Sequence, residues 1–376
     1  MKHLLPYFQQ ELPAALDFLE SMVNMESPST DKMLVDRFAR FVGSRFESLG
    51  GELDFVPAER FGDHLRVKFS GQSANRILLL GHTDTVFPAG EVAKRPFQIR
   101  GSKAMGPGVF DMKAGILLIW MALRGLAHEK TPLANSITVL LTSDEEVGST
   151  TSRALLETEA GLAKAVLVLE PSLPGGILKT ARKGVGRFTI KAIGRAAHAG
   201  VDPTRGINAI EEIAHQVMQL QAMGDDRGTT VTVGVIQGGT RSNVVPAEAA
   251  IEVDVRIASM EAAERISKAV HALKPRLSGA RLEIRGAISR PPMERTADTA
   301  RLFSLAQLLG VEMGMDIQEG STGGASDGNF TSALGIPTLD GLGAVGDGAH
   351  STEEFVDIAS LPQRAALIAG MIQRIR

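Results

Sequence analysis

The sequence predicts an α/β protein in which a mostly parallel, mixed sheet is flanked by helices, with a second, α+β domain inserted into the first. Strand and helix patterns alternate in the first part of the chain, which favours a largely parallel sheet. In the middle the order is β-α-β-β-α-β, the ferredoxin-like split motif. The chain has 376 residues, a length that suggests two domains.

In the first part of the chain, helical periodicity covers residues 4–24 and 30–49. Residues 112–126 are mostly apolar, which predicts a buried helix. Three short apolar runs predict buried strands at residues 77–80, 136–141 and 165–169.

The middle part of the chain supplies the elements of the inserted domain. Strands are predicted at residues 187–193, 229–237, 249–258 and 281–288, and helices at 206–223 and 260–277. After Pro291 and Pro292 the first pattern resumes, with a helix at 297–309, a strand at 336–339 and a helix at 361–375. We therefore expect a discontinuous first domain, residues 1–183 and 294–376, interrupted by a second domain at 184–293.

Composition excludes several classes of function. The formal net charge of −3 and the aromatic content of 5% give no footprint for nucleic acid or an anionic membrane. The chain has no cysteine, which excludes disulfides and thiolate metal sites. No apolar run approaches the roughly 18 residues of a membrane span, and the N-terminus does not resemble a signal peptide, so we expect a cytoplasmic protein.

Polar residues follow the three predicted strands of the first domain, where ligand sites of parallel sheets gather. His82 and Asp84 follow the first strand, Glu145 and Glu146 the second, and Glu170 the third. A satisfied polar pair at a strand end would also explain His82 and Asp84. Two adjacent acids are ordinary on a solvated loop, but they repel one another on a buried loop unless a cation compensates. One of them could then hold a metal while its neighbour acts as a base.

Two further residues extend this set. Asp111 follows a Gly-Pro-Gly turn just ahead of the buried helix, where it could equally cap the helix, and His350 lies in a glycine-rich turn. Together with His82, Glu146 and Glu170 they supply two imidazoles and three carboxylates, a donor set suited to Zn²⁺, with Co²⁺ or Mn²⁺ as alternatives. Three carboxylates are balanced by two divalent ions and one hydroxide, which favours a dinuclear site.

The runs GHTDTVFP, GPGVFDMKAG, SDEEVGS, LEP and AHSTEEF resemble the metal-dependent M20 peptidase family, and its glutamate carboxypeptidase (carboxypeptidase G2-like) branch in particular. The resemblance covers nearly the whole chain. It implies a zinc-peptidase type catalytic domain with an inserted lid and dimerisation domain. It also implies that Asp111 bridges two metal ions. The remaining ligands would be His82 and Glu170 at one ion, and Glu146 and His350 at the other.

The resemblance implies catalytic roles as well. Glu145 would be the general base and Asp84 would orient His82. His198, in GRAAHAGVDP, would stabilise the oxyanion in the active site of a partner subunit. The sequence departs from the family pattern at Ala197 and Ser326, where the family usually has Ser and commonly has Thr.

Substrate-binding positions are also implied. Asn243 and Arg256 would hold the substrate, with Arg256 on its carboxylate, and Gly323 and Gly324 belong to a glycine-rich loop at the substrate site, residues 321–328. Taken alone, His198 could be structural and Arg256 could pair with a surface acid. Arg285 and Arg290 are alternative carboxylate clamps, because a guanidinium offers a planar, bidentate fork.

The expected function is metal-dependent hydrolysis of an amide bond that releases a C-terminal amino acid, glutamate by resemblance, from a small substrate with a free carboxylate. A close rival is an N-acyl-amino-acid deacylase of the acetylornithine or succinyl-diaminopimelate type. A non-catalytic metal-binding scaffold is a remote alternative, since a scaffold has no need of a base such as Glu145. A nucleotide-dependent enzyme is disfavoured because the sequence contains no phosphate-binding loop.

Overall fold

A computed structural model describes residues 2–130 and 132–376, and its chain divides into two compact units. The first unit comprises Met1–Ala181, Arg295–Thr322 and Ser326–Arg376, and the second comprises Arg182–Glu294 with Gly323–Ala325. The short segment Gly323–Ala325 contacts the rest of the second unit through arginine side chains, because Arg256 and Arg182 donate hydrogen bonds to the carbonyl oxygens of Gly323 and Gly324.

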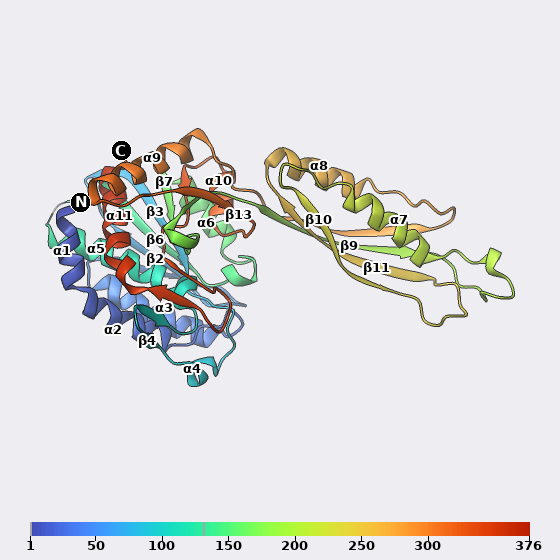
Figure 1. Cartoon of the computed structure of the whole chain (residues 1–376), viewed down its shortest axis with the longest axis horizontal. Helices are drawn as coiled ribbons and strands as arrows, with labels where there is room; N and C mark the ends of the chain where they lie inside the picture. The colour runs from blue at the N-terminus through green and yellow to red at the C-terminus, as the bar shows by residue number, and fades with distance from the viewer. Residues whose placement is uncertain (1, 131) are drawn as a thin grey trace. The chain divides into compact units, whose positions relative to one another are not determined.

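The first unit contains a six-stranded mixed sheet in the order β1-β2-β6-β3-β7-β14 (Figure 1). Four neighbouring strands run parallel: β6 (Asn135–Thr142), β3 (Ser73–His82), β7 (Ala165–Val168) and β14 (Thr338–Leu339). At one edge β2 (His64–Phe69) joins β6 antiparallel, and β1 (Glu52–Val56) joins β2 antiparallel. The predicted fold class, a mostly parallel mixed sheet, is confirmed.

Helices cover both faces of this sheet. Successive side chains of a strand point to opposite faces, and here the side chains on both faces are apolar. On one face Leu79 of β3 and Val139 of β6, both fully buried, pack into the main core with five long helices. These helices are α2 (Leu12–Val23), α3 (Lys32–Glu47), α5 (Ala114–His128), α9 (Ala297–Met313) and α11 (Leu361–Arg374). On the other face Leu78 and Leu80 pack into a smaller core with α6 (Arg153–Gly161) and α10 (Gly328–Ala333).

The apolar segments of the sequence occupy the interior of the first unit. The predicted buried helix corresponds to α5, in which nearly every residue is buried. The three predicted buried strands correspond to the second half of β3, to β6 and to β7, and their apolar side chains are almost completely shielded from solvent. Burial of these strands on both faces is typical of a parallel sheet that is covered by helices on either side.

Several predicted helices differ from the structure at their ends: those predicted at 206–223, 260–277 and 297–309 are observed as Ala209–Gln221, Met260–His271 and Ala297–Met313. The single helix predicted at residues 4–24 is two helices, α1 (Leu5–Gln10) and α2, separated at Glu11. Pro13 explains the break, because proline has no N–H to donate and its ring clashes with the carbonyl four residues earlier. The helix predicted to start at 112 starts at Ala114, after a π-helical turn at Val109–Lys113 in which Asp111 and Met112 have non-helical backbone angles.

Several short elements of the first unit carry no prediction from the sequence. They are α4 (Glu91–Lys94), β4 (Gln98–Arg100), β5 (Lys103–Met105), β8 (Leu178–Arg182), β13 (Glu319–Thr322), β15 (Gly346–Asp347) and β16 (Phe355–Asp357). The strands among them form a four-stranded sheet in the order β15-β16-β5-β4 and a pair of β13 with β8. These strands are too short for a periodic pattern to be recognised.

The second unit has the predicted β-α-β-β-α-β order. Its elements are β9 (Gly184–Ile193), α7 (Ala209–Gln221), β10 (Thr230–Gly238), β11 (Glu248–Ile257), α8 (Met260–His271) and β12 (Arg281–Arg290). The strands form an antiparallel sheet in the order β10-β11-β9-β12. Phe188, Ile190 and Ala192 alternate along β9 into the core beneath the helices.

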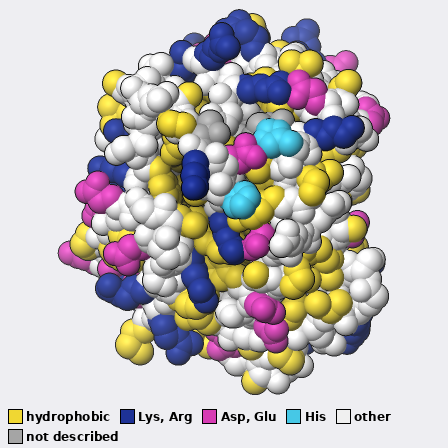
Figure 2. Space-filling view, turned by 90° about the vertical axis from the view of Figure 1, so that its left-hand side faces the viewer, with side chains coloured by type: hydrophobic (Ala, Val, Ile, Leu, Met, Phe, Trp, Pro, Cys, Tyr) yellow, Lys and Arg dark blue, Asp and Glu magenta, His cyan; other side chains and the backbone are white. Residues whose placement is uncertain are grey.

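The surface carries charges of both signs. On the face shown in Figure 2, acidic and basic side chains are interspersed, which agrees with the small net charge. Among the described residues, no helix has the length and apolar character needed to cross a bilayer.

Candidate metal centre

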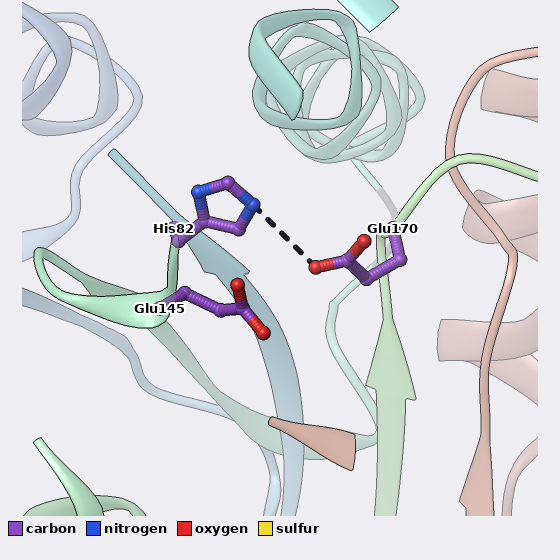
Figure 3. A group of neighbouring side chains, drawn as sticks. All are labelled: His82, Glu145 and Glu170. Carbon is purple, nitrogen blue, oxygen red and sulfur yellow. Dashed lines mark ion pairs between the residues drawn. The ribbon is translucent and has the colours of Figure 1, made fainter. Parts of the chain in front are cut away.

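Three polar side chains come together at the carboxyl ends of parallel strands (Figure 3). His82 is the last residue of β3, Glu145 opens the turn that follows β6, and Glu170 lies two residues after β7. The His82 Nε2 and Glu170 Oε1 atoms are 3.5 Å apart. One ligand atom from each of the three residues lies within 4.8 Å of the other two, so they can hold a metal ion.

Asp111 lies between the two predicted ligand histidines. Its Oδ1 atom is 3.2 Å from His82 Nε2, and its Oδ2 atom is 3.3 Å from His350 Nε2. Glu146 completes the group, with Oε2 at 3.2 Å from the same His350 nitrogen. The structure thus brings all five predicted ligands together, and the two oxygens of one carboxylate face different histidines, which is the arrangement that a bridging ligand requires.

The backbone explains how Asp111 reaches this place. Gly106 and Gly108 have φ angles of 146° and 71°, in the region that favours glycine. A Cβ atom at Gly108 would also lie 2.6 Å from Thr85 Cγ2. Asp111 does not cap the following helix, since the N-cap of α5 is Lys113. The capping alternative that its sequence position allowed is therefore not what the structure shows.

The neighbouring carboxylates raise the pKa values of the two histidines. Hydrogen bonds to Asp111 and then Glu146 raise the pKa of His350 to about 10. Burial lowers the pKa of His82, but hydrogen bonds to Asp111 and Asp84 outweigh it and hold that pKa well above the usual value. Burial raises the pKa of Glu146, whose side chain is 7% exposed. The carboxylates of the cluster therefore favour positive charge nearby. Protonated histidines supply it here, and divalent ions would supply it in their place.

Asp84 lies beside the site and contacts two of its segments. The His82 Nδ1 atom lies 2.9 Å from the backbone oxygen of Asp84 and 3.5 Å from its Oδ1 atom. Because a carbonyl oxygen can only accept, Nδ1 carries a proton, and Nε2, which faces the acids, is the nitrogen that would bind a metal ion once its own proton is displaced. The Asp84 carboxylate also accepts hydrogen bonds from the amides of Glu145 and Glu146, both at 3.2 Å.

The donor atoms have the spacing that a small divalent ion needs. Zinc bonds to nitrogen and oxygen of roughly 2.0–2.2 Å place neighbouring donors of a tetrahedron about 3.3 Å apart. The four measured separations at Asp111, Glu146 and Glu170 lie between 3.2 and 3.5 Å. Within the described part of the chain, Glu146 Oε1 is buried without a hydrogen-bond partner, so it has capacity for a ligand. The residues present fit two divalent ions.

Two buried acids near the site carry no prediction from the sequence. Glu354 lies four residues after His350 in the same AHSTEEF run, and Asp327 lies in the glycine-rich loop. Asp327 accepts hydrogen bonds from the hydroxyls of Thr142 and Ser149, which flank the turn that carries Glu145. The only indication in the sequence that these two acids matter is that they lie in motifs already assigned to the site.

In the second unit, His198 and Asn243 lie on neighbouring segments. The His198 Nδ1 atom accepts hydrogen bonds from the amides of Gly200 and Val201, at 3.1 and 3.2 Å. Its proton is therefore on Nε2, which makes this ring a hydrogen-bond donor. The backbone oxygen of Asn243 accepts from the amide of Ala199 at 3.0 Å.

Arg256 is engaged within the second unit. Its Nε and Nη2 atoms donate to the two carboxylate oxygens of Asp254, at 2.8 and 3.2 Å, and Nη1 donates to the Gly323 oxygen at 3.4 Å. Of the alternative clamps, Arg285 is exposed and Arg290 is buried. A substrate carboxylate at Arg256 would have to share or replace Asp254.

Comparisons with known proteins agree with this geometry. Residues 78–374 match the model of peptidase family M20/M25/M40. The chain is 32% identical to carboxypeptidase G2 of Pseudomonas sp. (strain RS-16), covering 96% of this chain and 89% of that protein. It is 30% identical to succinyl-diaminopimelate desuccinylase of Xanthomonas oryzae pv. oryzae, covering 81% and 85% of the two chains.

Solved structures share the fold. An aminopeptidase PepT from Bacillus cereus superposes with a TM-score of 0.81 at 22% identity, covering 96% of this chain and 98% of the other. A dinuclear metal binding peptidase of the M20 family from Bacillus subtilis superposes with a TM-score of 0.72 at 16% identity, covering 97% and 98%.

Proposed function

Because the chain belongs to peptidase family M20/M25/M40 and is a metallohydrolase, we propose that it releases a C-terminal amino acid, preferably glutamate, by hydrolysing an amide bond. The substrate is a peptide or N-acyl amino acid with a free carboxylate. The observation that carries the proposal is the Asp111 carboxylate between His82 and His350, with Glu145 beside them. The similarity to carboxypeptidase G2 over 96% of the chain supports the release of a C-terminal amino acid, and the choice of glutamate is part of the proposal.

In this proposal the site would hold two divalent ions, zinc by preference, with cobalt or manganese as alternatives, and Asp111 would be a ligand of both. His82 and Glu170 would complete the ligands of one ion, and Glu146 and His350 those of the other. When bound, the ions lower the pKa of a water molecule and polarise the scissile carbonyl.

The chain's own residues then move the proton and hold the charges. Glu145 takes a proton from the attacking water and passes it to the leaving amine. Asp84 keeps Glu145 in place through the Glu145 amide. The Nε2–H group of His198, supplied by the second unit of a partner chain in a homodimer, donates to the oxyanion.

Substrate binding is assigned to the second unit and its glycine loop. Asn243, Arg256, Gly323 and Gly324 hold the substrate, with its carboxylate at Arg256. A guanidinium is suited to a carboxylate, but Nε and Nη2 of Arg256 already donate to Asp254, so the substrate would share the Arg256 side chain with Asp254 or displace it.

The rival function is N-acyl-amino-acid deacylation. It is favoured by one observation, the 30% identity to succinyl-diaminopimelate desuccinylase over 81% of the chain. Both reactions cleave an amide beside an amino acid, so the proposed metal ligands serve either one. The acyl group and the amino acid distinguish them.

The deciding experiment measures metal content and hydrolysis of N-acyl-glutamates on one purified sample, before and after chelation. We expect about two zinc ions per chain, with activity lost to the chelator and restored by zinc. Acetylornithine and N-succinyl-diaminopimelate are assayed in parallel. Two metals with hydrolysis of only these two substrates would favour the deacylase, and no uptake of metal would contradict the ligand assignment.

A further inference from the structure

We propose that Glu354 is a positioning residue that fixes the bridging carboxylate of Asp111 by holding its backbone. The inference rests on the proposed function, because it concerns the same metal site. Glu354 is buried, at 1% exposure, and it is not itself one of the five proposed ligands.

The Glu354 carboxylate accepts three hydrogen bonds from one loop. Its Oε1 atom accepts from the amides of Phe110 and Asp111, both at 2.8 Å. Its Oε2 atom accepts from the amide of Gly108 at 3.0 Å. Both oxygens are therefore used, and one of the three donors is the amide of the bridging residue itself.

These amides need a partner from outside the loop. The backbone angles of Asp111 and Met112 are non-helical and α5 begins only at Ala114, so Phe110 and Asp111 cannot pair their amides as a regular helix does. A buried amide without an acceptor loses its hydrogen bonds to water and gains nothing in return, which destabilises the loop. Glu354 supplies the acceptor, and it thereby determines where the Asp111 Cα atom lies.

The same side chain also joins two ligand-bearing segments. Phe355, the next residue, opens β16 and pairs with Met105 at the end of β5, directly before the loop of Asp111. His350 lies four residues before Glu354 on the other side. β16 thus pairs with β5, and the Glu354 carboxylate just before β16 binds the loop that follows β5. It should set the separation of Asp111 Oδ2 and His350 Nε2, which is 3.3 Å.

Glutamate has the chemistry that this position needs. A carboxylate presents two acceptor oxygens, whereas glutamine replaces one of them with an NH₂ donor that would face an amide N–H. Aspartate keeps the charge, but its chain is one methylene shorter. Glu354→Gln and Glu354→Asp therefore each disturb the loop for a different reason.

The test is a metal titration of the full chain with Co²⁺ and Zn²⁺, starting from metal-free protein. We expect wild-type protein to take up two ions and each Glu354 variant to bind them about 10–100-fold more weakly, the range for residues that orient metal ligands. The visible absorption of the Co²⁺ form should also change in the variants, because it reports the coordination geometry.

The matched control is Glu159→Gln. Glu159 is also a buried acid of the first unit, but it pairs with Arg66 and Arg76 rather than with the metal loops. We expect this variant to lose stability while its metal affinity and Co²⁺ spectrum stay at wild-type values. This separates positioning of a ligand from a general loss of stability.

Three outcomes would overturn the inference or its premise. A folded Glu354→Gln protein with wild-type affinity and spectrum would overturn the inference and leave the proposed function intact. If neither Glu354 variant folds while Glu159→Gln does, the carboxylate serves folding, and the inference is equally overturned. Failure of wild-type protein to bind either ion would instead contradict the proposed function.

Discussion

Asp84 connects the two kinds of residue that the proposed reaction needs. It contacts the ring of the proposed ligand His82, and its carboxylate accepts from the amides of the proposed base Glu145 and the proposed ligand Glu146. A third donor is the hydroxyl of Ser29, at 2.7 Å. The role that the sequence suggested, orientation of one histidine, covers only part of these contacts.

We predict that Asp84→Asn lowers both metal affinity and kcat/KM by about 10–100-fold. The asparagine amide would present an N–H group to a backbone N–H of the acidic turn, so that one hydrogen bond is replaced by repulsion. Metal titration and steady-state kinetics measure the two effects. Ser29→Ala is the control, since it removes one contact and leaves the other acceptor sites intact; an equal loss in Ser29→Ala would argue against a special role for the charge.

Glu145 should affect turnover without affecting metal content. We predict that Glu145→Gln keeps both metal ions and reduces kcat by about 10²–10⁴-fold, because the amide cannot accept the proton of the attacking water. Metal analysis and kinetics on the same sample test this. Near-normal activity of the metal-loaded variant would show that another residue is the base.

Local sequence patterns located some site residues and missed others for a physical reason. His82, Glu145 and Glu170 follow apolar strands, and parallel strands bring their carboxyl ends to one edge. The Glu354 carboxylate accepts hydrogen bonds from amides some 240 positions away in sequence, which no local pattern reveals. Arg256 had an obvious chemistry, but its bidentate pair with Asp254 appears only in the folded unit.

At the scale of elements, prediction succeeded where a pattern is long and regular. The buried helix α5 and the four strands of the second unit were all expected near their observed positions. The edge strand β1 and its neighbour β2, which pairs antiparallel with β6, were not. Along β2 the buried Leu65, Val67 and Phe69 alternate with the half-exposed Arg66 and Lys68, a strand pattern that the prediction overlooked, whereas β1 has no fully buried residue.

Glu212 of α7 holds the segment that follows α8. It is fully buried, and its carboxylate accepts from the amides of Arg276 and Leu277, with the shortest contact at 2.7 Å. Burial raises the pKa of Glu212, but the hydrogen bond from Leu277 and others outweigh it, so the pKa is lower than in an unfolded chain. The carboxylate therefore stabilises the fold above the unfolded pKa of about 4.3, and this contribution is lost as pH falls through the lower folded pKa.

We predict that Glu212→Gln destabilises the second unit by about 1–3 kcal/mol at pH 7, because a buried amide loses its acceptor. The difference from wild type should shrink as the pH falls below about 4, where the wild-type carboxyl becomes protonated as well. Hydrogen exchange at the amides of 276 and 277 reports on this segment. Glu264→Gln, at an exposed position of α8, is the control. A pH-independent difference would contradict the assigned role of the charge.

At the scale of the whole chain, the two units have separate cores. Among the described residues, the buried members of the second unit's core all lie between Phe188 and Leu273, and none belongs to the clusters of the first unit. The five proposed metal ligands and Glu145 all belong to the first unit. A ligand that binds only the folded form stabilises the part that it contacts. Metal binding should therefore affect the two units differently.

We predict that metal ions protect the first unit from hydrogen exchange and leave the second unit unchanged. At a free metal concentration 100 times Kd, binding at one site adds about 2.7 kcal/mol to the stability of the folded form. Protection should rise most in the loops that carry or support the proposed ligands, at residues 106–113, 144–149 and 349–354. Exchange followed by mass spectrometry, with and without chelator, measures this for peptides of both units. Asp111→Asn is the control, because losing the bridging carboxylate should remove most of the response. Equal protection of β9 and β11 would mean that the two units open together or that metal also binds the second unit, and either result would contradict the predicted difference between the units.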